Sequence, residues 1–266
     1  MFGILPAMRP PIILCLLSFC SISLGEQPPE KRDAEAGMLG SFERQLAATT
    51  PENASVETHS RRGDLRLFLN QPREAVTEFE KMIALDPTQD APHWRLGIAY
   101  YFAGDFAKSS RQFEKYHPYD GRDRENGVWK FLAQARADGI EKARGEMLEY
   151  TIFDREPFPA LYEMFAGKRS GADVLAEMER KRLTGDARVM FFAHYYVGLN
   201  EELLGNRESA LEHLRKAVAF FTPETAGSGG PGYMWQVVRV HLARLASPAD
   251  RHAPSVKEAT TPSQLP

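Results

Sequence analysis

The sequence predicts an all-α fold, a right-handed alpha-solenoid of stacked helix pairs with one irregular helix pair inserted between repeats. Two observations predict it. Similar stretches recur at a spacing of 34 residues, and within them apolar side chains recur every three or four residues, as on amphipathic helices. With 266 residues, of which 43% are hydrophobic, the chain can bury the continuous core that stacked repeats need.

Residues 1–25 are predicted to be a signal peptide. They contain one cation, Arg9, then an uncharged apolar run from Ile12 to Leu24, and the small residue Gly25 before the expected cleavage site. The run of 13 residues is shorter than the ~20 that span a bilayer. The sequence therefore predicts an exported protein, periplasmic or secreted, with an uncleaved N-terminal anchor as the alternative.

Both cysteines of the chain, Cys15 and Cys20, lie in this segment. Cleavage would therefore leave no thiol for a disulfide, a metal site or a nucleophile. The letters LLSFC approximate the pattern at which bacterial lipoproteins are lipidated, but Phe19 stands where that pattern requires Gly or Ala. Contact with a membrane would be made only through an uncleaved signal or a lipid at Cys20.

The rest of the chain divides into segments that the periodicity defines. Aligning Gly63 with Gly97 also superposes Phe79 on Phe113, and the spacing of 34 residues is that of the tetratricopeptide repeat (TPR). In chain order, the prediction is a linker and N-terminal capping helix at 26–55, with the helix from Met38; repeats at about 56–89 and 90–123; a degenerate repeat at 125–148; a non-repeat helix pair at 150–187; a repeat at 191–224; a capping helix at 233–246; and a disordered tail at 247–266.

Matches of different strength support the later repeats. Trp94 and Gly104 are ten residues apart, as are Trp129 and Gly139, although most other positions of that third copy differ. YYVGLNEELLGNRESALEHLRKAVAFFTP, at 195–223, matches the repeat best.

Small residues are expected where the helices of a pair approach closely, with large residues beside them. Glycine is also expected where a first helix ends and φ becomes positive. The expected small residues are Ala75, Gly97, Gly198 and Ala210; their large neighbours are Phe79, Phe113 and Leu214; and the helix-ending glycines are Gly104, Gly139 and Gly205.

The stretches RLGIAYYFAGDFAKSSRQF, WKFLAQARADGIEKAR, YEMFAG and YYVGLNEELLGNRESALEHLRKAV follow one another in the sequence. Their order and spacing, over roughly residues 56–246, resemble the NlpI family of bacterial lipoproteins and its exported TPR relatives. The resemblance implies an all-helical protein that dimerises and acts in the cell envelope as an adaptor, bringing peptidoglycan hydrolases together with a regulatory protease. The sequence departs from the family at the lipid-bearing cysteine.

In this repeat class the first helix of each pair lines a concave groove. The stripe is rich in aromatic side chains, which are typical anchors of protein recognition surfaces, so it is predicted to bind an envelope protein or an extended peptide. Burial against neighbouring helices is an equal alternative for Trp94 and Trp129. Carried over residue by residue, the inner stripe consists of Leu67, Phe68, Trp94, Ile98, Tyr101, Phe102, Trp129, Arg136, Tyr195, Leu199, Glu202 and Leu203.

Other functions have weaker support. GSGGPG at 227–232 matches the pattern G-x-G-x-x-G, but no predicted strand precedes it, so a flexible connector is favoured. The histidines have no metal-binding spacing, and no cofactor is expected. Asp154 with Arg155 forms a conceivable polar site in the inserted helix pair. The formal charge of −3, without a polybasic run, disfavours nucleic acid as a partner.

Three hypotheses follow from the sequence. The leading one is a non-catalytic, exported TPR scaffold or adaptor that binds envelope proteins or peptides in its groove. The second is a structural solenoid that self-associates, for example as a homodimer, through the same aromatic residues. The third is a hydrolase with an unrecognised site within residues 150–187.

Overall fold

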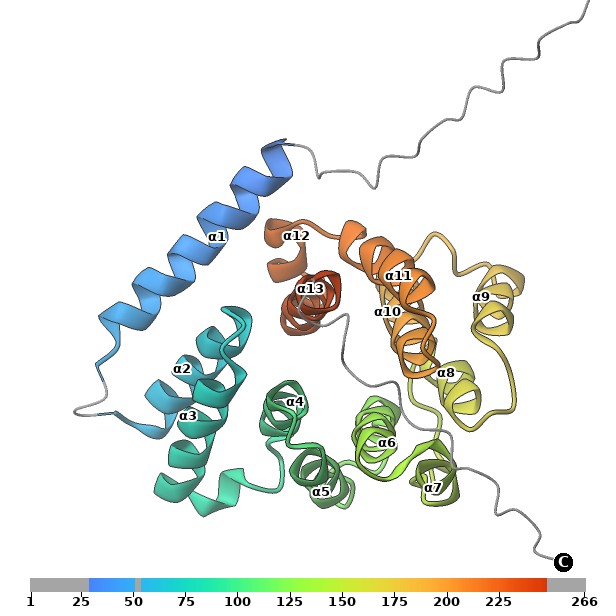
Figure 1. Ribbon diagram of the computed structural model, residues 1–266, viewed down its shortest axis with the longest axis horizontal. Coiled ribbons are helices and arrows are strands. Elements are labelled where there is room, and N and C mark those ends of the chain that lie inside the picture. Colours follow the sequence, from blue (N-terminus) through green and yellow to red (C-terminus); the bar gives the residue numbers. More distant parts are fainter. Residues whose placement is uncertain (1–28, 51–53, 248–266) are drawn as a thin grey trace, which may run out of the picture.

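The described part of the protein is all-α, as the sequence predicts. In the computed structural model, residues 29–50 and 54–247 are described, and every regular element in them is helical (Figure 1). The predicted signal peptide at 1–25, with Cys15 and Cys20, lies outside the described residues, as does all but Ser247 of the predicted tail.

The N-terminal half consists of consecutive helices that pack against their neighbours in chain order. The first helix begins nine residues before Met38, because the preceding segment is rich in Glu, Lys, Arg and Ala, which favour helix. The helices are α1 (Pro29–Ala48), α2 (Val56–Phe68), α3 (Pro72–Leu85), the short 3₁₀ helix η2 (Pro87–Gln89), α4 (Trp94–Ala103) and α5 (Phe106–Tyr116).

The C-terminal half contains the inserted segment and the last helix pair. Ser170 caps α9, where its side chain accepts a hydrogen bond from the Asp173 backbone N–H at 3.2 Å. The helices are α6 (Arg124–Asp138), α7 (Ile140–Gly145), α8 (Phe158–Phe165), α9 (Gly171–Arg180), α10 (Ala187–Leu203), α11 (Arg207–Ala219), α12 (Pro223–Gly227) and α13 (Gly232–Ala246).

Three helix pairs turn in the same way. Asn70 between α2 and α3, Gly104 between α4 and α5, and Gly205 between α10 and α11 have φ values of 59°, 84° and 84°. Glycine adopts this left-handed conformation without steric cost, and asparagine tolerates it better than most residues. Asn70 and Gly104 are 34 residues apart, so the period of the sequence is present in the backbone. Gly139, with φ of 100°, ends α6, and the three expected positive φ values are confirmed.

The predicted close approaches within the helix pairs are confirmed. A Cβ atom added to Gly63 would lie 2.3 Å from the Phe79 ring, and one added to Gly97 would lie 2.7 Å from the Phe113 ring. Real Cβ atoms almost never come that close to a neighbour, so only glycine fits at these two positions. The other packing positions named from the sequence are buried as well: Ala75, Gly198, Ala210 and Leu214.

The helix α13, predicted as the C-terminal cap, packs against α11 of the last helix pair and is enclosed on other sides as well. Figure 1 shows it near the middle of the molecule, beside α11 and α12 and facing α2 and α4. It is buried on several faces, since Trp235, Val237 and Val240 are buried together with Met234 and Val238. A cap exposes one polar face, whereas a helix that is apolar on most sides belongs in the interior. This helix is therefore enclosed more completely than the predicted terminal cap, although it packs on α11 of the last helix pair, as a cap would.

None of the helices within 29–50 and 54–247 combines the length and the apolar character that crossing a membrane would require.

Candidate functional site

The twelve residues of the predicted groove lie on the first helices of the pairs, where they were expected. They do not form an open surface: eight are buried and the other four are partly buried. Leu67 and Phe68 lie at the end of α2; Trp94, Ile98, Tyr101 and Phe102 on α4; Trp129 and Arg136 on α6; and Tyr195, Leu199, Glu202 and Leu203 on α10.

Much of this inner face is covered by α13. The ring of Tyr233 meets Phe68 and Trp94 edge-on, with centroids 5.0 and 4.8 Å apart. Further along the helix, the ring of His241 meets Phe102 edge-on at 5.3 Å. Such edge contacts between rings are favourable beyond the area that they bury. The expectation of an exposed aromatic stripe is therefore wrong for most of its length, because the chain places its own last helix against it.

A partly buried ionic cluster fixes α13 to two other helices. Glu202 of α10 accepts a hydrogen bond from Arg136 of α6 and lies 2.7 Å, Oε2 to Nε2, from His241 of α13. Burial alone would raise the pKa of Glu202, but His241 and Arg136 outweigh it and hold the pKa at about 2. The carboxylate therefore stays ionised, and its place in the groove prediction is explained by a structural role.

The helix α1 also holds α13 in place. Arg239 of α13 donates to the Phe68 carbonyl and lies 3.3 Å from the Glu35 carboxylate of α1. Gln236 of α13 donates to the Met38 sulfur of α1 at 3.1 Å. As Figure 1 shows, α1 runs along the edge of the molecule from α2 toward α12. It therefore completes the enclosure of α13.

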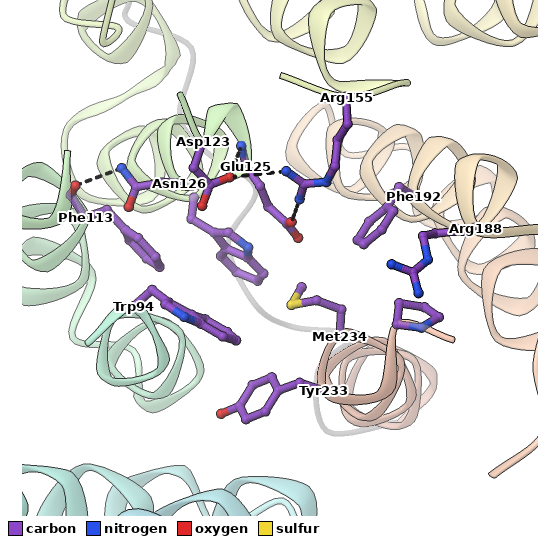
Figure 2. A pocket seen from close by; sticks show the side chains of 12 residues that line it. Trp94, Phe113, Asp123, Glu125, Asn126, Arg155, Arg188, Phe192, Tyr233 and Met234 are labelled. Atoms are coloured by element: carbon purple, nitrogen blue, oxygen red, sulfur yellow. Dashed lines mark hydrogen bonds and ion pairs between the residues drawn. The ribbon is translucent and has the colours of Figure 1, made fainter. Parts of the chain in front are cut away.

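A cavity of about 340 Å³ remains where α13 begins, between that helix and α4, α6 and α10 (Figure 2). Its walls combine aromatic rings with charged and amide groups. The lining residues are Trp94, Phe113, Asp123, Glu125, Asn126, Trp129, Arg155, Arg188, Phe192, Pro231, Tyr233 and Met234.

The charged wall of the cavity is built around Arg155, which lies in the loop before α8. Its guanidinium donates to Glu125 at 2.5 Å and to Asp154 at 2.9 Å, and lies 3.7 Å from Asp123. Asp123 also caps α6, since its side chain accepts the Glu125 backbone N–H at 3.1 Å. The start of α6 therefore places two carboxylates on the cavity, and the inserted segment supplies their cation.

The surroundings of Glu125 shift its proton equilibrium. Burial raises the pKa of this carboxyl to about 7, although Arg155 lowers it; the neighbouring Asp123 raises it further. The hydroxyl of Tyr196, from α10, donates to the other carboxylate oxygen. Burial also raises the pKa of Asp123. A carboxyl that titrates near neutral pH beside an open cavity is typical of functional sites.

The sequence indicated this site in part. Trp94 and Trp129 belong to the predicted groove, and Asp154 with Arg155 is the polar site that the sequence offers in the inserted helix pair. Trp94 is only half-buried and lines the cavity, whereas Trp129 is 1% exposed and is a core residue at its wall. Reasoning from the sequence missed Asp123 and Glu125, since an Asp before a helix and a Glu in its first turn are ordinary helix-start residues.

The G-x-G-x-x-G match is a loop between two helices. Its first residue ends α12 and its last begins α13. No strand precedes it within the described residues, which agrees with the connector interpretation.

Metal-binding groups are not predicted from the sequence. Among residues 29–50 and 54–247, no group of three or more His, Cys, Asp or Glu side chains is placed to hold a metal ion. Compared with the models of known protein families, the chain matches none.

Proposed function

We propose that this chain is an exported, non-catalytic TPR-type scaffold or adaptor that binds a protein or peptide of the cell envelope, and that its partner enters at the cavity beside the start of α13. The observation that carries the proposal is this cavity, where aromatic and charged side chains from five helices and the loop before α8 converge. Concave sites with a few convergent polar groups are the usual binding places of proteins.

The architecture behind the proposal is a right-handed TPR-type solenoid interrupted by the inserted helices. The recurrence of the Gly63–Phe79 contact as Gly97–Phe113 supports it, because both contacts occupy equivalent positions 34 residues apart. Export rests on the predicted signal peptide, and action in the envelope rests on the resemblance to the NlpI family. A homodimer is part of the same proposal.

The place of α13 narrows where a partner can bind. A helix lying in a groove is a common mode of recognition, and here the chain supplies such a helix itself. A partner that used the whole inner face would have to displace α13 and break the cluster of Glu202, Arg136 and His241. Entry at the cavity requires neither change, so we place recognition there.

The test is photo-crosslinking from the rim of the cavity. Arg188 lines the cavity and is exposed, so a photoreactive side chain at this position should capture the partner from an envelope extract. The matched control places the same group at Glu57, an exposed position on α2 away from the cavity. We expect one protein captured only from position 188, and its loss on Trp94→Ala. Equal capture from both positions would contradict the site, and capture of the chain itself would favour the self-associating solenoid.

A hydrolase is the alternative function, and the raised pKa of the Glu125 carboxyl favours it. Such a carboxyl can donate a proton near neutral pH. If the protein were an enzyme, a purified, partner-free preparation would hydrolyse envelope material and Glu125→Gln would abolish the activity. We expect no hydrolysis from either protein.

A further inference from the structure

The charges around the cavity do not balance. Asp123, Glu125 and Asp154 all face the single guanidinium of Arg155, and the charged groups that act on the Glu125 carboxyl are this arginine and the other two carboxylates. Three carboxyl groups thus share one cation at a partly desolvated site, and when Glu125 holds its proton the two ionised aspartates still exceed the arginine by one negative charge. Removing negative charge from water without a partner is costly, so the site gains from a second cation.

The other arginine at the cavity does not fill this role. Arg188 stands at the N-terminal end of α10, across the cavity from the carboxylates in Figure 2. Its guanidinium donates to the backbone carbonyls of Gly229 at 2.5 Å and of Gly230 at 3.4 Å. It is exposed and is not among the charged groups that act on Glu125. The surplus of negative charge therefore remains on the α6 side.

The remaining walls suit an organic cation. Trp94, Phe192 and Tyr233 present aromatic rings to the cavity, and the faces of such rings attract cations. The protein already places one of its own cations, Arg155, near aromatic rings. The guanidinium of Arg155 lies 4.2 Å from the centroid of the Phe158 ring and 5.7 Å from that of Phe192.

A buried acceptor at the wall points to a ligand with N–H groups. Asn126 is 2% exposed and lines the cavity, and its Nδ2 donates to the Phe113 carbonyl at 3.0 Å. Its Oδ1 accepts no hydrogen bond from any of the described residues. A buried acceptor without a donor is costly, and an ammonium or guanidinium group would supply one.

We propose that this cavity binds the side-chain cation of a lysine or arginine in an extended segment of the partner, between the carboxylates of α6 and the aromatic walls. The inference rests on the proposed function, in that the partner enters at this place. A volume of about 340 Å³ is near the lower end of ligand pockets, which suits one side chain with its flanking backbone.

The experiment uses the full chain and three short peptides, acetyl-Gly-X-Gly-amide with X as lysine, norleucine or glutamate. Norleucine keeps the length of the lysine stem without its charge. Binding is followed by tryptophan fluorescence, since two of the three tryptophans line the cavity. We expect saturable binding of the lysine peptide and about tenfold weaker binding of norleucine, the loss that one desolvated cation contact produces. The glutamate peptide should not bind.

Variants test the source of the selectivity. Asp123→Asn should weaken the binding of the lysine peptide severalfold. Glu57→Gln, which removes an exposed carboxylate away from the cavity, should leave this binding unchanged. If the Asp123→Asn variant does not fold, the proposal is tested by the order of the three peptide affinities for the wild-type protein. Equal binding of lysine and norleucine, or tighter binding of glutamate, would overturn the proposal. If no peptide binds while position 188 still captures a partner, the cation inference fails and the proposed function stands. Loss of capture would make the proposed function itself fail.

Discussion

Two partly buried glutamates illustrate how position determines chemistry at the scale of the residue. Glu125 and Glu202 both hydrogen-bond to groups from other helices or loops, yet the pKa of Glu125 is raised to about 7 and that of Glu202 is lowered to about 2. Glu125 shares its arginine with two further carboxylates, whereas Glu202 faces Arg136 and His241. The balance of neighbouring charges separates a group that titrates from one that holds helices together.

Glu125→Gln should remove a pH dependence of stability. The folded protein holds a proton on Glu125 up to about pH 7, whereas the unfolded chain releases it near 4.5. The folded state therefore binds more protons in this window, and the free energy of unfolding falls as pH rises through it. Arg155, Asp123, Asp154 and Tyr196 face the group and remain in the variant.

The size of this effect follows from the shift. Between about pH 4 and about pH 8, the wild type should lose on the order of 3 kcal/mol relative to Glu125→Gln. Urea titrations of both proteins at several pH values measure the difference. If the free energies of unfolding of the two proteins changed in parallel with pH, the pKa of Glu125 would not be raised in the folded protein, and the prediction would be wrong.

Gly97→Ala should disrupt the packing of α4 on α5. The added Cβ would lie 2.7 Å from the ring of Phe113, which is 1% exposed and cannot move without disturbing the core. Overpacking of this kind costs ~1 to 3 kcal/mol of unfolding free energy. Gly145→Ala is the matched control, because its Cβ would meet nothing within 4 Å, and the change should stay below about 1 kcal/mol. Equal effects in thermal melts would argue against the helix-pair contact.

At the scale of the element, α13 decides what the inner face can do. The stretch YMWQVVRVHLARLA has apolar residues at helical spacing, which predicted a helix there. Trp235, Val237 and Val240 fall on other sides of the same helix and were a signal for an interior position. Apolar spacing on one face of a helix does not distinguish an amphipathic helix from a buried one. The residues on the other faces of 233–246 must be considered as well, and several of them are also apolar.

Glu202→Gln should loosen α13. The substitution leaves the partly buried Arg136 and the buried His241 without their carboxylate, and breaking such a pair costs ~3 to 5 kcal/mol. Because the pKa of Glu202 is lowered in the folded state, its contribution is present above about pH 4.5 and disappears as pH falls toward 2. The difference between wild type and variant in urea should therefore shrink in acid.

The control for this prediction is Glu212→Gln. Glu212 pairs with Lys216 at 2.7 Å on the exposed face of α11, and surface pairs of this kind contribute ~0.5 kcal/mol or less. If both substitutions cost the same at neutral pH, the cluster around Glu202 does not hold α13.

At the scale of the whole molecule, local patterns were predictable, whereas the candidate site was predictable only in part. The 34-residue spacing led from sequence to the helix pairs and to the contact of Gly97 with Phe113. The cavity joins groups that are far apart in the chain, such as Glu125 with Arg155, 30 residues on, and with Tyr196, 71 residues on. No periodicity encodes such contacts, which arise only when α6, α10 and the inserted segment are packed together.

The central claim is that α13 closes the inner face and leaves recognition to the cavity at its start. Amide hydrogen exchange of the full chain, with and without the lysine peptide, tests it most directly. We predict slow exchange in α13 in both conditions, with added protection confined to residues 123–129 and 231–235. Fast exchange of α13 in the free protein, or its loss of protection when the peptide binds, would contradict the claim.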